Sequence, residues 1–198
     1  MLARGAVGYA LFCIGGATLA FTGGRYALGA LRQQEARLEW QEAEARSIVA
    51  LAHHTASADV GLPMPTVIGA PVARLMIPRL GLDEIVLEGV DDDVLNAGPG
   101  HLPGSALPGE RGNAVISAHR DRHFARLGDV RVGDTLVTEF AARRARWVVI
   151  STHVIDADAP ALFHTREATL TLTTCWPIRY FGSAPDRLIL TAKPLASS

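Results

Sequence analysis

The chain has 198 residues, a length typical of a single domain, and 48% of them are apolar, which is enough for a packed core. The formal net charge is −1, and this near-neutral balance argues against a nucleic acid as the main partner. The two cysteines, Cys13 and Cys175, lie near opposite ends of the chain. A disulfide framework is therefore not expected.

The first predicted element is an uncharged helix over residues 5–24, GAVGYALFCIGGATLAFTGG. A helix of this length is about 30 Å long, which matches the hydrocarbon core of a bilayer. Six glycines lower its hydrophobicity, and no A-x-A site follows cleanly, which argues against cleavage as a signal peptide. We therefore expect residues 1–27 to form a short tail and a transmembrane anchor, with the rest of the chain outside the cytoplasm.

The next unit, residues 28–72, is predicted to be a helical stalk and a linker. Leu28, Leu31 and Leu38 recur at roughly helical spacing with charged residues between them. Because heptads are not sustained, a solvated stalk is favoured over a coiled-coil seam. Proline, glycine and serine then accumulate in residues 53–71, which is typical of a linker.

The remaining residues, 73–198, are predicted to form a mainly β domain. Short helical turns are expected at 91–98 and 122–129, and Gly- and Pro-rich turns at 98–113 and 131–134. Close strand spacing with little helix predicts an antiparallel barrel or sandwich. Seven β-branched or alternating segments are the expected strands: 73–80, 84–89, 113–119, 134–140, 145–155, 168–175 and 187–193.

Cys175 ends the alternating run TLTTC (171–175) and is followed at once by Trp176 and Pro177. Proline cannot continue a β-ladder, so the cysteine is placed at a strand end, where a rigidly held side chain can face a groove. An unpaired thiol outside the cytoplasm is either buried and inert or reactive and retained for use. Both possibilities stay open, and the strand-end position favours a nucleophile.

Two residues are candidate partners for this thiol. His119 ends the apolar segment NAVISAH and is the best candidate for the proton partner that a thiol nucleophile needs. Arg187 opens the segment RLILTAK, and the intervening loop suits an antiparallel return that sets it across from Cys175. A guanidinium there could stabilise a thiolate or donate to a developing oxyanion.

Together these motifs resemble the sortases, cysteine transpeptidases of bacterial surfaces. TLTTC (171–175) matches the family's TLxTC signature, and ISAHRD (116–121) is similar to its histidine segment. GPGHLPGSALPGERGN (98–113) resembles the turn before that segment, and DRLIL (186–190) matches the place of its arginine. The resemblance covers residues 73–193. The TTCWP ending and the compact length are most similar to the single sortases of Gram-negative bacteria, class GN.

The resemblance implies a closed eight-stranded β-barrel whose groove holds an LPxTG-like sorting signal. It implies that the Cys175 thiolate attacks the Thr–Gly carbonyl and forms a thioester. His119 would give a proton to the leaving amine and take one from the incoming amine, and Arg187 would brace the carbonyl oxygen. No metal or organic cofactor is required by this chemistry.

The implied partners are a protein with a C-terminal sorting signal and an amine-bearing acceptor. The implied location is the bacterial inner (plasma) membrane, with a single-pass anchor and the catalytic domain on the periplasmic side. No nucleic acid is expected to bind.

Five more residues are candidates for substrate binding or support. Thr173 and Thr174 adjoin the nucleophile, and the Thr174 hydroxyl could assist there. Asp121 either orients the histidine or caps a turn. Trp176 is either a wall of the groove or part of the core. His101 either lines the groove or is an ordinary loop histidine.

Two other functions remain open. The first is another thiol acyltransferase, one that acts on cell-wall peptides and accepts stems with D-amino acids. The second is a non-catalytic, membrane-tethered β domain that binds a partner and keeps Cys175 buried. Accessibility of the thiol separates this second function from the enzymes.

Overall fold

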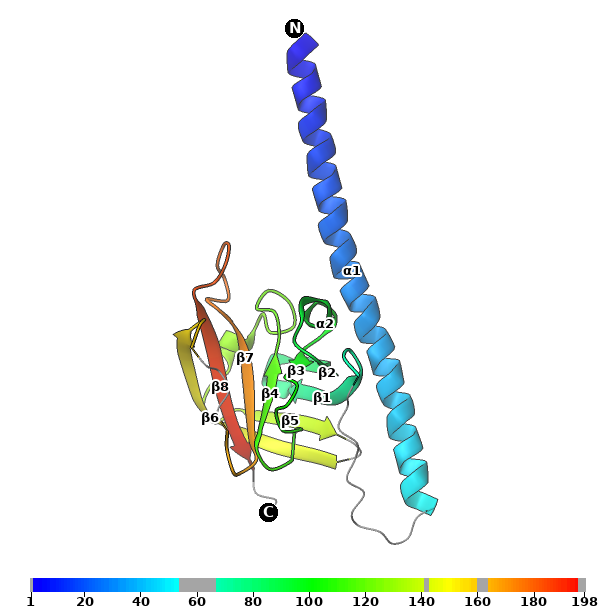
Figure 1. Ribbon diagram of the computed structural model, residues 1–198, viewed down its shortest axis with the longest axis vertical. Coiled ribbons are helices and arrows are strands. Elements are labelled where there is room, and N and C mark those ends of the chain that lie inside the picture. The colour runs from blue at the N-terminus through cyan, green and yellow to red at the C-terminus, as the bar shows by residue number, and fades with distance from the viewer. Residues whose placement is uncertain (1, 54–66, 141–142, 160–163, 196–198) are drawn as a thin grey trace.

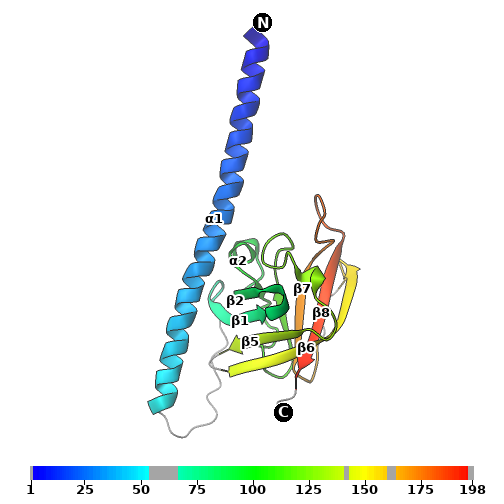
Figure 2. The ribbon, with the colours of Figure 1, turned by 180° about the vertical axis from the view of Figure 1, so that it is seen from behind.

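The computed structural model describes residues 2–53, 67–140, 143–159 and 164–195. A β-barrel stands beside one long helix, α1 (Leu2–His53), whose N-terminal end extends well beyond the barrel (Figures 1 and 2). One short helix, α2 (Asp92–Ala97), and two 3-10 turns (Pro78–Leu80 and Leu127–Asp129) lie between strands. The strands are β1 (Pro71–Ile77), β2 (Leu82–Glu88), β3 (Gly100–His101), β4 (Asn113–Ser117), β5 (Thr135–Phe140), β6 (Arg143–Asp156), β7 (Thr169–Trp176) and β8 (Asp186–Pro194).

The eight strands close into a barrel in the order β1-β2-β3-β4-β7-β8-β6-β5, and β5 pairs with β1. The closed, mainly β fold is therefore confirmed. The pairing is not purely antiparallel, because β2 and β3 are parallel and so are β4 and β7. The β4–β7 pair matters for function, since both expected catalytic segments end at the same edge of a parallel pair.

The strand that sequence reasoning missed is β3. It has two residues, Gly100 and His101, between Pro99 and Pro103, so its composition is that of a turn. Gly100 lies so close to the carbonyl oxygen of Gly89 that a Cβ there would overlap it. Close backbone approach thus explains a glycine in a strand that pairs on both sides.

The barrel interior is an apolar core. Large side chains at alternate strand positions are fully buried there, as the period of two in a strand requires. The one polar group among them is satisfied, because the Trp147 Nε1–H donates to the Thr138 hydroxyl at 2.9 Å. The fully buried core side chains include Leu75, Ile77, Ile116, Leu136, Trp147, Leu170, Leu172 and Leu190.

Helix α1 packs on the barrel through a second, smaller cluster. Gln33 is buried in this contact, and its side-chain oxygen accepts from the Ile85 amide at 2.9 Å. Its side-chain nitrogen donates to the carbonyl oxygens of Ala97 at 3.1 Å and of Ile85 at 3.2 Å. The expectation of a solvated stalk is wrong for this face of the helix. The apolar members are Ala36, Ile85, Leu87, Val94 and Ala97, with Trp40 packed against them.

Helix α1 runs unbroken through the boundary expected after residue 27. Within the described part of the chain, no helix is long and apolar enough to cross a membrane. The transmembrane segment expected over residues 5–24 is therefore not supported. Most of the expected linker, residues 54–66, lies outside the described residues.

Candidate active site

Cys175 lies one residue before the end of β7, and its thiol is exposed. Leu170 and Leu172 on the same strand belong to the core. Because side chains alternate along a strand, Cys175 shares the opposite face with Thr173. Exposure excludes the buried, inert thiol that the sequence left open.

Strand β8 places an arginine directly across from this cysteine. β7 and β8 are antiparallel, and Cys175 pairs with Arg187 in their register. Residues paired in this way have Cβ atoms about 4.5–5.5 Å apart. The predicted pairing of these two residues is confirmed. In the structure as described, the exposed Arg187 guanidinium forms no hydrogen bond or ion pair, so it is available to a ligand.

Strand β4 flanks β7 on the other side and brings the histidine. The two strands are in parallel register up to Ser117. Beyond it, the Ala118 amide donates to the Thr173 carbonyl at 3.2 Å, and the Thr174 hydroxyl donates to the Ala118 carbonyl at 2.7 Å. These bonds continue the alignment past the end of β4. They place the backbone of His119 alongside that of Cys175, with Arg187 on the opposite flank of β7.

The surroundings of His119 favour the neutral imidazole. Burial is the main cause that lowers its pKa below the ordinary value. The charges of Asp121 and Asp92 oppose this shift, and those of Arg122 and His123 add to it. A partly buried, neutral imidazole is suited to take a proton from an incoming group.

Arg120 holds the loop that follows the nucleophile. Its guanidinium donates to the carbonyl oxygens of Pro177 at 3.2 Å, Tyr180 at 3.2 Å and Gly182 at 2.7 Å. It also lies 5.7 Å from the centroid of the Tyr180 ring. Sequence reasoning did not select this residue. The available signal was a basic residue directly after the candidate histidine.

The two threonines before Cys175 differ in their roles. The Thr174 hydroxyl is used within the protein, since it donates to the Ala118 carbonyl and thereby aligns the histidine segment. Thr173 is 4% exposed, and its hydroxyl has no hydrogen-bond partner among the described residues. An unsatisfied buried hydroxyl costs about 1–3 kcal/mol, so a peptide lying on this face would gain by bonding to it.

Comparison with known families identifies the family to which this chain belongs. Residues 75–195, more than half of the chain, match the Sortase domain family. The chain belongs to the sortase family. The matched region contains His119, Cys175 and Arg187, the residues that the motifs predicted for a cysteine transpeptidase.

Individual sortases agree with this assignment. The chain is 36% identical over 122 residues to Sortase D of Bacillus subtilis, and the match covers 60% of this chain and 61% of that protein, which is less than two thirds of it. The catalytic domain of B. anthracis SrtD is 33% identical with a TM-score of 0.57, covering 71% of this chain and 97% of that one. A Clostridium perfringens Sortase D5 transpeptidase shares the fold with a TM-score of 0.68 at 22% identity, covering 84% of this chain and 100% of that one.

The expected subclass is not confirmed by these sortases. Their names place them in class D, and Bacillus subtilis is Gram-positive, whereas the TTCWP ending and chain length predicted class GN. The ending describes only the terminus of β7. It carries little information about the loops and surfaces in which sortases of one fold can differ.

The structure corrects the groove position considered for His101. This residue lies in β3 and is fully buried. Its Nδ1 is 2.7 Å from Glu88 Oε2, and its Nε2 is 2.9 Å from the Ala106 carbonyl and 3.0 Å from Ser105 Oγ. His101 therefore ties β2 and β3 to the following loop of the sortase fold and does not line a groove.

Trp176 and Asp121 lie near the site in different ways. Trp176 is partly buried and packs against the main core, beside Gly128. It therefore supports the end of β7 from the core side. Asp121 is exposed and lines a cavity together with His119, whose pKa its charge raises.

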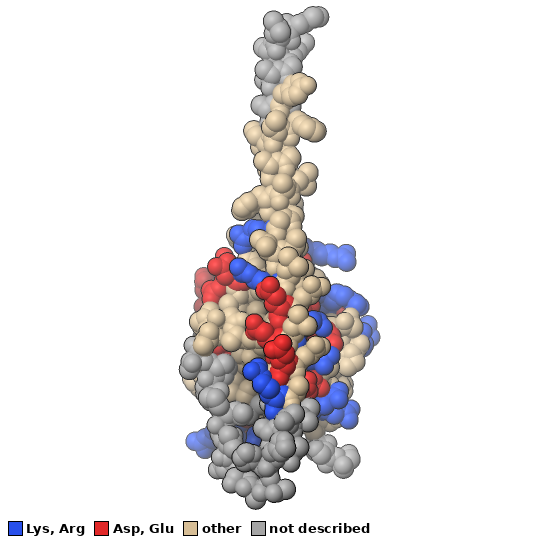
Figure 3. Space-filling model, turned by 90° about the vertical axis from the view of Figure 1, so that its right-hand side faces the viewer, with Lys and Arg blue, Asp and Glu red and all other residues tan. Residues whose placement is uncertain are grey.

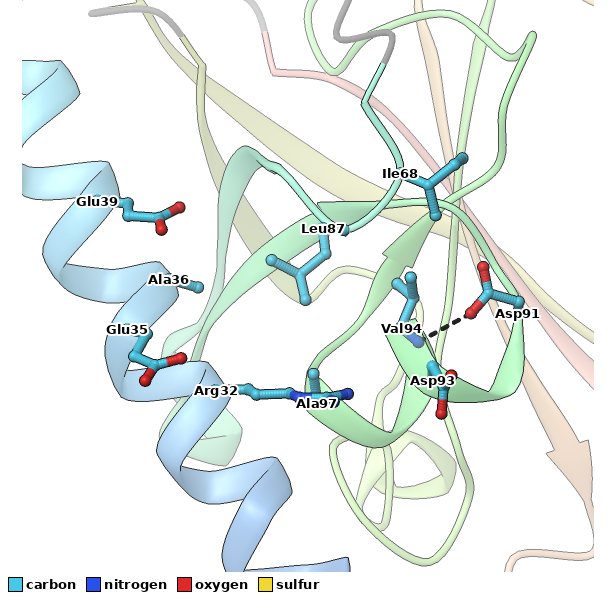
Figure 4. A pocket seen from close by; sticks show the side chains of 11 residues that line it. Arg32, Glu35, Ala36, Glu39, Ile68, Leu87, Asp91, Asp93, Val94 and Ala97 are labelled. Atoms are coloured by element: carbon cyan, nitrogen blue, oxygen red, sulfur yellow. Dashed lines mark hydrogen bonds between the residues drawn. The ribbon is translucent and has the colours of Figure 1, made fainter.

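A separate hollow of about 530 Å³ lies between α1, α2 and β2. Glu35, Glu39, Asp91 and Asp93 line it, with Arg32 reaching from the helix (Figure 4). Acidic side chains also gather where α1 crosses the barrel (Figure 3). The hollow is apart from the catalytic candidates, none of which line it. In the described ranges, no three His, Cys, Asp or Glu side chains are grouped so as to hold a metal ion.

Proposed function

We propose that the chain is a transpeptidase that cleaves an LPxTG-like sorting signal between threonine and glycine and transfers the acyl part to an amine. One observation carries the proposal: β7 presents an exposed Cys175 between Arg187 and the segment that holds His119. A nucleophile, a proton carrier and a cationic donor at one sheet edge are the groups that acyl transfer needs.

In the first half-reaction, the Cys175 thiol gives its proton to neutral His119, and the resulting thiolate attacks the threonine carbonyl carbon of the signal. The oxygen gains negative charge, and the Arg187 guanidinium donates hydrogen bonds to it. Collapse of this species breaks the C–N bond. The His119 imidazolium gives its proton to the leaving glycine amine, and a thioester remains on the sulfur.

In the second half-reaction, an acceptor amine attacks the thioester carbon. The neutral His119 takes a proton from the amine, the C–N bond forms and the C–S bond breaks. Burial, which lowers the pKa of His119, favours the neutral ring that this half requires.

The signal peptide is proposed to lie along the face of β7 that carries Thr173 and Cys175. The unpaired Thr173 hydroxyl would bond to its backbone. The loop held by Arg120 adds an apolar surface, because Phe181 is fully exposed and Tyr180 is half exposed on it. An exposed aromatic side chain on the loop that follows the nucleophile is suited to contact a substrate side chain.

The proposed partners are a protein with a C-terminal sorting signal and an amine-bearing acceptor. The proposed location of the catalytic domain is the extracytoplasmic side of the bacterial inner membrane. This location rests on the family alone, whose members act at bacterial surfaces.

Intact mass spectrometry tests the reaction. The full chain is mixed with a pool of LPxTG-like peptides, quenched in acid and weighed. We expect an adduct whose mass is that of a peptide up to its threonine, and we expect Cys175→Ala to lack it. The adduct mass also reports the preferred signal, which bears on the subclass.

Other outcomes would overturn the proposal in distinct ways. If no adduct forms although iodoacetamide alkylates Cys175, the substrate is wrong, and a thiol acyltransferase acting on cell-wall peptides becomes the better assignment. If no adduct forms and Cys175 also resists alkylation in the folded chain, the enzyme assignment itself fails.

A further inference from the structure

A short segment, residues 119–127, follows β4 and begins with the catalytic candidate His119. Its far end is held by the core, because Phe124 and Leu127 are fully buried there. Two backbone bonds close its first turn, since the amides of Arg122 and Phe124 donate to the His119 carbonyl at 3.4 Å and 3.2 Å. The side chain of Arg122, between these points, contacts helix α1. A contact with the helix therefore acts close to the histidine.

The Arg122 side chain is enclosed by three groups. Its guanidinium carbon lies 3.8 Å from the centroid of the Tyr26 ring on α1, a distance at which a cation is attracted to an aromatic face. Its Nη1 donates at 2.9 Å to the carbonyl of Asn96, near the end of α2. A Cβ on Gly29, about one turn from Tyr26 along the helix, would lie only 3.0 Å from the same nitrogen. The guanidinium is therefore held between the two helices.

A second contact connects α1 to the same segment. Arg37 Nη2 is 3.9 Å from Glu84 Oε2, and Glu84 Oε1 is 3.5 Å from His123 Nδ1. Partly exposed ion pairs at these distances contribute little to stability, so they align α1 with the segment more than they hold it. The contact of Tyr26 with Arg122 is therefore the closer and stronger connection between α1 and the histidine segment.

The His119 ring borders a cavity of about 310 Å³ that α1 completes, and Tyr26 and Arg122 also line this cavity. Burial is the main cause that lowers the pKa of His119, and the charge of Arg122 lowers it further. The other charged or titratable groups on the elements around the ring are Asp121 and His123 of its own segment, Asp92 of α2, Arg25 of α1, and Cys175 and Arg187 of the neighbouring strands. Arg122 is thus a cation that favours the neutral ring and that α1 holds in place.

We propose that Tyr26 of α1 is a positioning residue for His119 and that it acts by holding the Arg122 guanidinium. This inference rests on the proposed function, in which His119 carries protons for the thiol and the amines. A held Arg122 fixes the first turn after the histidine and keeps a positive charge at a constant place near the ring. The neutral ring that accepts the proton of Cys175 is thereby favoured. Helix α1 then supports the chemistry as well as packing on the barrel.

The titration of His119 and the pH dependence of thioester formation test this role together in the full chain. In Tyr26→Ala the aromatic face is lost and Arg122 can move away, so we expect the NMR titration of the His119 side chain to move to higher pH. Thioester formation with an LPxTG-like peptide needs the neutral ring, so the acid limb of its pH profile should move in the same direction. We expect the rate below the midpoint to fall about threefold, the size of effect that a partly exposed contact of this kind can have.

Three variants separate positioning from a merely structural role. Tyr26→Phe keeps the aromatic face and should behave like the wild type in both measurements. Leu28→Ala, at a side chain that is 59% exposed on the same helix, is the matched control and should also leave both unchanged. In an Arg122→Gln background, Tyr26→Ala should add no further change, because Tyr26 acts through the guanidinium.

The inference would be overturned if His119 titrated at the wild-type pH in Tyr26→Ala, even with a lower Tm, because Tyr26 would then only support α1. It would also be overturned if Tyr26→Phe behaved like Tyr26→Ala, or if Tyr26→Ala had its full effect in the Arg122→Gln background. Failure of the proposed function is recognised separately. The wild-type chain would then form no thioester, while the NMR titration would still report whether Tyr26 acts on His119.

Discussion

The inside of the barrel and the contact between α1 and the barrel are stabilised by different means. The barrel core is a continuous apolar cluster to which β1, β2 and β4–β8 all contribute. The α1 contact buries a few apolar side chains and depends on the hydrogen bonds of Gln33 and on the contact of the Tyr26 ring with the Arg122 guanidinium. A large apolar core unfolds as a unit, whereas a small contact of this kind can open locally. Cys175 and Arg187 are thus held by the stable part, while Tyr26 and Gln33 of α1 belong to the separable part.

The largest effect is expected from a cavity in the barrel core. Trp147→Ala removes a fully buried side chain and leaves the Thr138 hydroxyl unpaired. We expect the free energy of unfolding to fall by about 3–5 kcal/mol, measured by denaturant titration. Val132→Ala, at a side chain that is 64% exposed, is the control and should change little. A loss below about 1 kcal/mol for Trp147→Ala would contradict a single tightly packed core.

Gly29→Ala should separate α1 from the barrel locally without unfolding the barrel. A Cβ there would overlap the Asn96 carbonyl, so the helix must move away. Hydrogen exchange over residues 25–40 should accelerate about tenfold, while the barrel transition stays in place. The matched control is Gly24→Ala, whose Cβ meets nothing within 4 Å and which should favour the helix by up to about 1 kcal/mol. Equal exchange in both variants would mean that the contact does not hold α1.

Loosening the loop after the nucleophile should slow the chemistry more than it lowers stability. Arg120→Ala removes three hydrogen bonds to the loop that follows Cys175. We expect thioester formation to slow about tenfold, because a misplaced site loses rate steeply, with little change in Tm. Arg120→Lys should lose less, and Arg131→Ala, at an exposed arginine, should behave like the wild type. An equal fall in Tm and rate would indicate a structural role alone.

The smallest effect concerns the titration of His119. Asp121→Asn removes a charge that raises the pKa of His119, so the titration of the ring should move to lower pH, as followed by NMR of its side chain. Asp129→Asn, at another exposed carboxylate, is the control. A move to higher pH would show that Asp121 does not act through its charge.

The same shift has a consequence for stability. Because the folded pKa of His119 lies below the unfolded value of about 6.5, the unfolded chain binds the extra proton first. The contribution of His119 to the free energy of unfolding is therefore constant above the unfolded pKa. This contribution is lost as the pH falls below the unfolded pKa. His119→Gln should weaken this loss in acid unfolding curves.

Local pattern was enough to predict much of the catalytic edge. The alternation in residues 168–175 and the proline after Trp176 placed Cys175 near a strand end. The length of the next loop then predicted that Arg187 would face it, and the register confirms this. These inferences hold because strand period, proline chemistry and hairpin return act over a few residues, where neighbours in sequence are neighbours in space.

Other features depended on contacts that no local pattern records. β3 has a turn-like sequence and exists because β2 and β4 pair with it. The sequence around His101 is that of a loop, and only the contacts of its ring with Glu88 and Ser105 show that it is a buried structural residue. The role of Arg120 is visible only in its hydrogen bonds to carbonyl groups of the loop after Cys175.

The sequence by itself determined every strand of the barrel except β3, the three candidate catalytic residues and the family. Only the tertiary structure decided that β4 and β7 are parallel, that α1 packs on the barrel, and that Arg25 and Asp121 share a cavity beside His119. The physical reason is the separation of these partners along the chain. Their pairing depends on the closure of the whole barrel and on the packing of α1 against it. Neither of these long-range contacts produces a periodic pattern in the sequence of the residues concerned.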